Sequence, residues 1–299
     1  MSRAKANLLL LLAGAVWGMG FVAQSTAMDA IGPMLFISLR FLLAMLVVLP
    51  FALLESAKAQ TSLSHSDIKG FVWIGLALFS GMAAQQVGLL TTTVTNAGFL
   101  TGLYVVFVPF LMVIFLRQYP HPVVWPGALL AFAGIWLLSG GNLTDLNTGD
   151  ALVILCAVFW ASQVLLIGVY GTRTGRPLTL SAVQFGICSL LAFAIALVSE
   201  PIAWNAIVQA APEILYSGIF SSGLAFTLQV IGQRYTSSAQ AAIFLSSEAL
   251  FAALFGAIFL GERIAGMGYL GCLFIFAAML AVEIVPATTG RHARNVNVS

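Results

Sequence analysis

The sequence predicts an all-α integral membrane protein, with ten transmembrane helices forming two inverted five-helix repeats around a central cavity. Three observations support this fold class: a very hydrophobic composition, ten apolar stretches of spanning length, and an internal repeat at a spacing of 144 residues. An odd number of spans in each copy would place the second copy upside down in the membrane. Inverted repeats are typical of secondary transporters, whose substrate site lies near the bilayer midplane.

The composition excludes several other classes of protein. Hydrophobic residues make up 61% of the 299 residues and charged residues only 7%, whereas a soluble domain carries about 25% charged residues. The three lysines lie outside any phosphate-binding loop motif, and the net charge of +2 is too small to suggest a nucleic-acid partner. The cysteines lie in separate apolar spans, and the histidines lie in loops or the tail. We therefore expect no ATP-driven pump, no metal and no cofactor.

The spans are placed by apolar length, which must be about 20 residues to cross the hydrocarbon core. Several begin just after a proline, as helix starts tolerate. The first apolar run is longer than the core of a cleavable signal peptide, about 7–15 residues, so we interpret it as an uncleaved span. The predicted spans are residues 7–27, 33–54, 70–90, 95–116, 123–140, 150–170, 178–199, 213–232, 239–260 and 266–285.

The repeat is visible in residues that recur 144 positions later. In the third and fourth spans, Gly88, Thr92, Ala97, Phe107, Phe115 and Leu116 recur as Gly232, Thr236, Ala241, Phe251, Phe259 and Leu260. Trp17 and Trp160 correspond to each other one residue out of this register. The expected organisation is a first repeat over residues 7–140, a second over residues 150–285, and a cytoplasmic tail over residues 286–299.

Charge sets the expected orientation. With the N-terminus in the cytoplasm, ten lysines and arginines fall on the inner side and Arg263 alone falls outside, with Arg40 inside a span. This distribution follows the positive-inside rule closely. We therefore expect a multi-pass protein of the bacterial inner membrane with both termini in the cytoplasm. The glycosylation motifs at Asn142 and Asn297 are interpreted as chance.

Two ionisable residues lie within spans of different repeats: Arg40 in the second and Glu248 in the ninth. A charge at the bilayer centre costs about 2.5–3.5 kcal/mol on insertion scales, so such residues are functional candidates. We expect them to approach each other or to share a polar network. Two interpretations stay open. They are a buried pair holding the halves together, or Arg40 faces an acidic substrate group and Glu248 carries a proton.

Glutamines and aromatic residues share inward-facing helical faces, as Trp17, Phe21 and Gln24 do at positions i, i+4 and i+7. Each glutamine alone is explained by interhelical hydrogen bonding, worth about 0.6 kcal/mol. Together they predict an aromatic, amide-lined and nearly uncharged cavity that suits small amphipathic solutes. The predicted substrate-binding residues are Trp17, Phe21, Gln24, Arg40, Gln85, Asn96, Tyr104, Trp160, Gln163, Gln184, Phe226, Gln229, Phe244, Ser247 and Glu248.

The fifth and tenth spans instead carry small residues at helical spacing, which favour tight helix packing. They lack polar residues near their midpoints, so we expect peripheral supports or an oligomer contact, in a monomer or a homodimer. In the fourth span, Pro109 predicts a kink.

These residues resemble a known family. Trp17-Gly18 with Phe21, followed by Leu39-Arg40-Phe41, resembles the start of the EamA-type branch of the drug/metabolite transporter superfamily. Residues 99–109 resemble the end of its first repeat, and residues 248–251 and 260–263 the end of its second. The resemblance covers residues 7–285, although Arg117-Gln118 stands where the second copy has Gly261-Glu262. It implies a ten-helix basket whose fifth and tenth helices lie outside the cavity wall, and export of amino acids, metabolites or drugs.

The composition is similar to that of the aromatic amino-acid exporters within this branch. The leading hypothesis is therefore export of aromatic and other neutral amino acids by alternating access, and the alternative is a proton-coupled exporter of drugs or other small metabolites. A sugar-phosphate carrier would need several basic residues in its cavity, and only Arg40 is available. Neither a catalytic constellation nor a channel-like ring of like charges is evident. The exact substrate, the coupling ion and the oligomeric state stay open.

Overall fold

The computed structural model describes residues 1–138, 147–263 and 266–288, and all regular secondary structure in these ranges is helical. The first repeat contains α1 (Arg3–Ala27), α2 (Pro33–Lys58), α3 (His65–Gly88), α4 (Val94–Thr101), α5 (Tyr104–Leu116) and α6 (Val124–Leu138). The second contains α7 (Thr148–Thr174), α8 (Pro177–Ser199), α9 (Trp204–Gln209), α10 (Ala211–Tyr216), the π-helix η1 (Ser217–Phe226), α11 (Thr227–Gln233), α12 (Ser238–Leu245), α13 (Glu248–Leu260) and α14 (Gly266–Thr288).

The predicted fold class is confirmed. Within the described residues, nine helical segments are long and apolar enough to span a membrane, and α6 is a shorter apolar helix. α14 continues to Thr288, beyond the predicted end of the tenth span. The motifs at Asn142 and Asn297 and most of the predicted tail lie outside the described residues.

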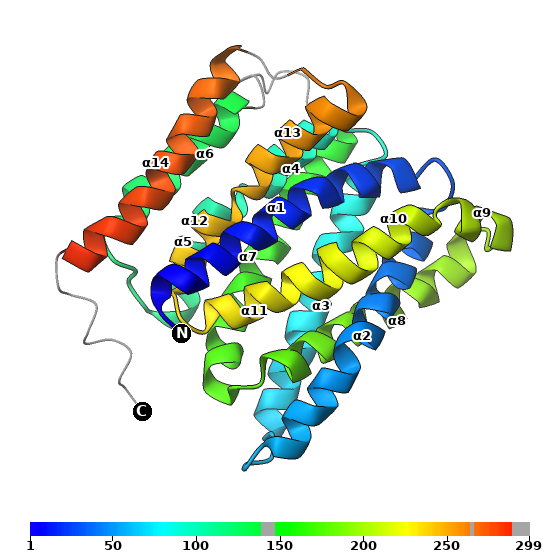
Figure 1. Cartoon of the computed structure of the whole chain (residues 1–299), viewed down its shortest axis with the longest axis horizontal. Coiled ribbons are helices and arrows are strands. Elements are labelled where there is room, and N and C mark those ends of the chain that lie inside the picture. Colours follow the sequence, from blue (N-terminus) through cyan, green and yellow to red (C-terminus); the bar gives the residue numbers. More distant parts are fainter. Residues whose placement is uncertain (139–146, 264–265, 289–299) are drawn as a thin grey trace.

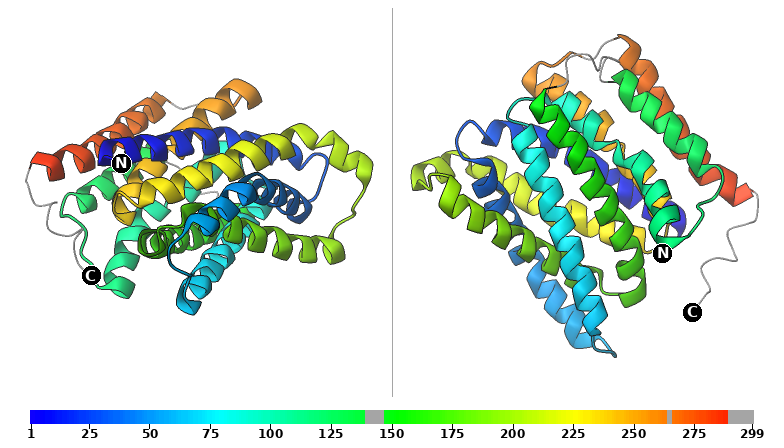
Figure 2. Two further views of the ribbon diagram at one scale, coloured as in Figure 1. Left: turned by 60° about the horizontal axis from the view of Figure 1, so that its bottom comes forward. Right: turned by 180° about the vertical axis from the view of Figure 1, so that it is seen from behind.

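The helices pack as two copies related by an approximate two-fold axis. α2 lies along α8, and α6 lies along α14 at one edge of the molecule (Figure 1). α3 lies along α7, as the view from behind shows (Figure 2), and η1 and α11 correspondingly lie along α1. The pairs α2–α8 and α6–α14 each join equivalent helices of the two repeats. The pair α3–α7 is repeated as the equivalent pair of α1 with η1 and α11.

Contacts between helix ends fall on two opposite faces. On the first, which we call the Arg173 face, Arg3 pairs with Glu283 and Arg173 pairs with Asp67. On the second, the Glu262 face, the Glu262 carboxylate accepts hydrogen bonds from the backbone N–H groups of Val94 and Thr95, both at 3.0 Å. Successive predicted spans run in opposite directions, so their ends alternate between these two faces.

Carboxylates from distant residues cap several helix starts. Glu200, after α8, accepts from the N–H groups of Met34 and Leu35 at 2.8 Å each. Glu55, in α2, accepts in turn from the N–H groups of Leu178 and Thr179 at the start of α8. The first N–H groups of a helix lack partners within it and attract negative charge, so these two carboxylates tie α2 and α8 together at both ends.

The fifth and tenth predicted spans, α6 and α14, pack against each other through small residues. A methyl group added at Gly134 would lie 2.6 Å from the carbonyl oxygen of Gly271, so the backbones approach closely. The small-residue faces are therefore used within one chain, and the pair lies at the edge of the molecule (Figure 1).

The fourth and ninth spans are each broken into two helices. α4 gives way to α5 at Gly102–Leu103, and α12 gives way to α13 at Ser246–Ser247, 144 residues later. Pro109 lies inside α5 and the interruption precedes it, so the break is separate from the kink predicted at Pro109, which stays a prediction. Both breaks lie beside the cavity described below.

The eighth span was predicted as one continuous helix, yet ten of its residues form the π-helix η1. Its sequence contains glycine and serine at several positions, which are weak helix formers. π-helical turns are rare and occur frequently at functional sites. η1 is buried against α1 and α2, and it supplies two residues to the cavity.

Candidate functional site

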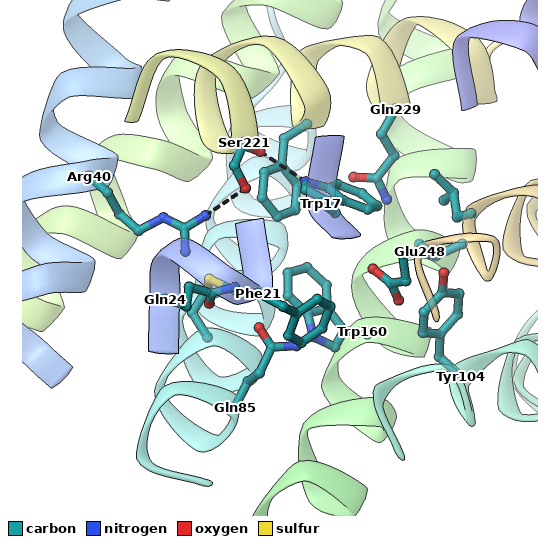
Figure 3. Close-up of a pocket in the computed structure, with 14 residues that line it drawn as sticks. Trp17, Phe21, Gln24, Arg40, Gln85, Tyr104, Trp160, Ser221, Gln229 and Glu248 are labelled. Atoms are coloured by element: carbon teal, nitrogen blue, oxygen red, sulfur yellow. Dashed lines mark hydrogen bonds between the residues drawn. The ribbon is translucent and has the colours of Figure 1, made fainter. Parts of the chain in front are cut away.

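A narrow cavity lies between the two repeats. All of its lining residues are buried, none more than 9% exposed, so the cavity is largely closed to the outside. The fourteen residues come from both repeats (Figure 3): Trp17, Phe21, Gln24, Arg40, Met82, Gln85, Tyr104, Trp160, Val164, Ser221, Phe226, Gln229, Leu245 and Glu248.

The repeat symmetry explains much of this lining. Gln85 and Gln229 are 144 residues apart, as are Tyr104 and Glu248. The two charges arise where the copies differ. The residue equivalent to Glu248 in the first repeat is Tyr104, and the residue equivalent to Arg40 in the second repeat is Gln184. A nearly symmetric framework thus encloses an asymmetric pair of charges.

Aromatic rings form the middle of the cavity. Phe226 lies 4.6 Å from Trp17 and 5.4 Å from Trp160 between ring centroids, and it is nearly parallel to Trp160 at 18°. The Trp17 Nε1–H group donates to the Ser221 backbone carbonyl at 2.9 Å (Figure 3). This bond fixes the Trp17 ring against η1, so the aromatic wall is preorganised.

Arg40 lies at one end of the cavity. Its Nε donates to the Ser222 hydroxyl at 2.9 Å and its Nη2 to the Ser221 hydroxyl at 3.1 Å. The guanidinium also lies over the rings of Phe36 and Phe41, at 5.6 and 5.2 Å. Its Nη1 is buried and has no hydrogen-bonding partner among the described residues. Arg40 therefore offers one free donor and a positive charge to a ligand.

Glu248 is the first residue of α13, where the N-terminus of a helix favours negative charge. It lies beside Tyr104 (Figure 3). Its Oε1 has no hydrogen-bonding partner within the described part of the chain. The side chain is 5% exposed, so this carboxylate offers a buried acceptor.

Of the two arrangements expected for Arg40 and Glu248, the direct pair is not found among the described residues, and both side chains line one cavity. Figure 3 shows the two side chains on opposite sides of the aromatic residues. The ion pairs found within the described ranges lie elsewhere, between helix ends on the Arg173 face. The two residues share a cavity, and they do not form a buried salt bridge between the halves, because the aromatic rings separate them.

Amide side chains extend behind the lining. Gln229 donates to Gln163 at 3.0 Å, and Gln163 donates to Gln184 at 3.2 Å. Gln85 donates to the Thr101 hydroxyl at 2.9 Å, next to the break between α4 and α5. The Oε1 atoms of Gln24 and Gln229 lack partners among the described residues. The cavity therefore contains free acceptors as well as free donors, which besides Arg40 Nη1 are the Trp160 Nε1–H and the Tyr104 hydroxyl.

Five predicted site residues do not line the cavity. Gln163 and Gln184 lie behind Gln229. Asn96 lies in the first turn of α4, where its N–H bonds the capping Thr93. Ser247 packs against Gly14 of α1, and Phe244 is a partly buried core residue. The other ten predicted residues line the cavity, and substrate binding by them stays a prediction.

The predicted set misses Met82, Val164, Ser221 and Leu245. Three are apolar residues that no sequence signal separates from lipid-facing ones. Ser221 faces the cavity because it lies in η1. A π-helix has more residues per turn than an α-helix, so the residues of this span that face the cavity shift by about one position. No cluster of three or more metal-ligating side chains occurs in the described residues.

The chain is similar to several proteins that are themselves described as uncharacterized transporters. One from Archaeoglobus fulgidus is 33% identical, with 95% of this chain and 87% of the relative covered. YwfM of Bacillus subtilis is 24% identical, covering 94% of each chain, and the inner membrane transporter YedA of Escherichia coli is 25% identical, covering 89% and 86%.

The architecture is also found among solved structures. A protein of known crystal structure superposes with a TM-score of 0.76 over 96% of this chain and 99% of its own, at 18% identity, which shows a shared fold. The EamA-like transporter family matches residues 4–140 and again residues 147–283. The chain is therefore a membrane transporter of small substrates, and it belongs to the EamA-like transporter family.

Proposed function

We propose that this transporter exports neutral amino acids, aromatic ones among them, across a bacterial inner membrane by alternating access. The observation that supports the proposal is the enclosed aromatic cavity with one unpaired cationic donor, on Arg40, and one unpaired carboxylate oxygen, on Glu248. The lining carries one positive and one negative group, so it suits a ligand with no net charge that has both charges itself.

A buried polar atom without a partner costs about 1–3 kcal/mol. The cavity holds several such atoms, and a zwitterionic amino acid offers a carboxylate acceptor for Arg40 Nη1 and an ammonium donor for Gln24 Oε1. The rings of Trp17, Trp160 and Phe226 would contact an apolar side chain. A sugar phosphate fits poorly, because Arg40 is the one basic residue in the lining.

Alternating access accounts for a cavity closed on both sides. The broken spans, α4–α5 and α12–α13, cross the helices of the other repeat next to the cavity, and such discontinuous helices commonly form the binding sites of secondary transporters. The Arg173 face carries the basic helix ends, so the positive-inside rule supports a cytoplasmic location of this face, with both termini in the cytoplasm as part of the proposal. The name of the YedA relative agrees with an inner-membrane location.

A second candidate is a proton-coupled exporter of cationic drugs or other metabolites. The unpaired carboxylate of Glu248 favours it, because such a group can bind a proton or a cation. Arg40 in the same cavity disfavours a cationic substrate, since the two positive charges would repel each other.

The test is uptake of labelled phenylalanine, tryptophan, threonine and methionine into liposomes, with and without a pH gradient. We expect saturable uptake in the wild type and at least about a tenfold loss with Arg40→Gln, which removes a buried charge-assisted contact. Arg173→Gln is the matched control, because Arg173 lies at a helix end outside the cavity and its loss should leave uptake unchanged.

Absence of amino-acid uptake by folded wild-type protein would contradict the proposal and favour the second candidate. If uptake occurs, its response to the gradient decides the role of Glu248. Uptake that ignores the gradient indicates facilitated diffusion, and uptake driven by it makes Glu248 the leading proton site.

A further inference from the structure

We infer that the end of the cavity formed by Glu248, Tyr104 and Gln229 selects amino acids whose side chain terminates in a hydrogen-bond donor. The indole N–H of tryptophan and the phenol O–H of tyrosine are such donors, and phenylalanine has none. This inference rests on the proposed function, since it assumes that the backbone groups of an amino acid bind at the opposite end, near Arg40.

The opposite end can hold both backbone charges of an amino acid. The carboxylate and the ammonium group are attached to the same carbon, so they must bind close together. Arg40 presents the free Nη1 donor for the carboxylate, held in place by Ser221 and Ser222. The Gln24 Oε1 is a free acceptor for the ammonium group, and Gln24 lies on the Arg40 side of the cavity in Figure 3.

The aromatic residues then determine where the side chain lies. Trp17 and Trp160 lie between Arg40 and Glu248 (Figure 3), and Phe226 packs against both rings. A flat side chain that packs on these rings extends away from Arg40, so its far edge reaches the Glu248 end. The α-ammonium group cannot reach Glu248 in this pose, because the aromatic section separates the two.

The Glu248 end holds two acceptor oxygens without a hydrogen-bonding partner among the described residues, and one hydroxyl, that of Tyr104, which lies beside Glu248 and is also unpartnered. The Oε1 atoms of Glu248 and Gln229 are both unpartnered, and these side chains are 5% and 1% exposed. A carboxylate oxygen and an amide oxygen can each accept such a hydrogen bond. Such an end gains from a ligand N–H or O–H group. It is left unsatisfied by a ligand with a C–H or a sulfur atom at the same place.

A comparison of the two repeats supports a role in selection. The first repeat has Tyr104 at the position of Glu248, and its helix is broken at the equivalent place. The carboxylate is therefore not needed to form the break. Its position at the first turn of α13 keeps negative charge favourable there.

The test compares ligands that differ only in this donor. Tryptophan and benzothienylalanine have nearly the same shape, but sulfur replaces the indole N–H in the second. We expect the purified wild type to bind tryptophan at least about tenfold more tightly, because sites built to bond a substrate N–H or O–H reject analogues without it. Tyrosine should likewise exceed phenylalanine.

The variant Glu248→Gln keeps the shape and replaces one acceptor oxygen with an NH₂ donor, so the preference for tryptophan should fall to about threefold or less. Glu213→Gln is the matched control. Glu213 contacts Thr26 near the end of α1 rather than the cavity, so the preference should not change.

Equal binding of tryptophan and benzothienylalanine by the wild type would overturn the inference, as would an unchanged preference in folded Glu248→Gln. If the variant fails to fold, the wild-type ligand pair decides alone. Failure of the proposed function gives a different result, because then none of the four amino acids would bind.

Discussion

Arg40 shows how one buried residue is held ready for a ligand. It is 1% exposed, and a buried charge is expensive unless it is paired or hydrogen-bonded. Two serine hydroxyls of η1 satisfy part of the guanidinium and leave Nη1 free. The orientation of the binding group therefore depends on residues that need not contact the substrate themselves.

The variant Ser222→Ala tests this dependence at the residue scale. It removes the acceptor of the Arg40 Nε–H group, a charge-assisted bond worth about 1.5–3 kcal/mol. We expect about a tenfold weaker binding of the amino acid, measured by calorimetry on the purified protein. Ser199→Ala, which removes only a bond to the Ile195 carbonyl at an exposed helix end, should bind normally. Unchanged affinity in Ser222→Ala would show that the serine does not position Arg40.

A second residue-scale prediction concerns backbone strain at Arg117. It has φ 52°, and the equivalent Gly261 has φ 70°; both end a helix in the left-handed conformation. A residue with a side chain there is disfavoured by about 1–2 kcal/mol relative to glycine. Arg117→Gly should therefore raise the melting temperature in detergent. Arg234→Gly is the control, because Arg234 has φ −67°, and glycine at an ordinary helical position lowers stability.

At this scale, much of the lining could be predicted from the sequence and part of it could not. Polar and aromatic residues within apolar spans are conspicuous, and Trp17, Gln85 and Gln229 were found in this way. Met82, Val164 and Leu245 look the same in sequence whether they face lipid or a cavity. The sequence leaves open whether Arg40 and Glu248 pair or share a polar network, because it does not show the rings that lie between them.

At the scale of elements, distant carboxylates determine where several helices begin. Glu262 bonds the N–H groups of Val94 and Thr95, and also the Thr95 hydroxyl. It follows α13, so it joins the start of α4 to the other repeat. The first repeat has Gln118 at the equivalent position, so the two faces of the molecule differ in this contact.

The variant Glu262→Gln tests the cap. Its amide keeps one acceptor but loses the charge that favours a helix N-terminus, so α4 should lose about 0.5–2 kcal/mol, the usual range for a lost cap. Hydrogen exchange of residues 94–98 should accelerate roughly tenfold, following the same free energy. Glu200→Gln should instead accelerate exchange at the start of α2. Equal exchange of α4 in wild type and Glu262→Gln would rule out the cap.

The elements also show what a sequence pattern can and cannot give. Apolar length and prolines such as Pro33 and Pro177 placed the spans, because these are local signals. The breaks at Gly102 and Ser246 and the π-helix η1 depend on packing between the repeats, so local patterns gave a continuous helix at each.

At the scale of the whole molecule, the two repeats close the cavity differently. On the Glu262 face α4 crosses α13, and on the Arg173 face α12 correspondingly crosses α5. The first crossing contains Gly98 packed against Ala249 and Ala252. Their counterparts are Ala242, Val105 and Val108, which are larger. The Glu262 face therefore has the tighter crossing, with the carboxylate cap in addition.

This difference leads to a prediction about transport. A methyl group added at Gly98 would lie 2.9 Å from the Ala252 methyl, so Gly98→Leu should hold the Glu262 face open. Ala242→Leu, at the equivalent position 144 residues later, should open the Arg173 face instead. Alternating access requires that opening one side closes the other, so each variant should slow transport while favouring a different state.

Spin labels on the exposed residues Leu90 and Phe259 report on the Glu262 face, and labels on Tyr235 and Phe115 report on the Arg173 face. In Gly98→Leu, the distance across the Glu262 face should lengthen while the other stays the same or shortens, and in Ala242→Leu the responses should be reversed. If both distances lengthen together in either variant, the substitution has loosened the whole bundle. The two crossings would then not act as alternating gates.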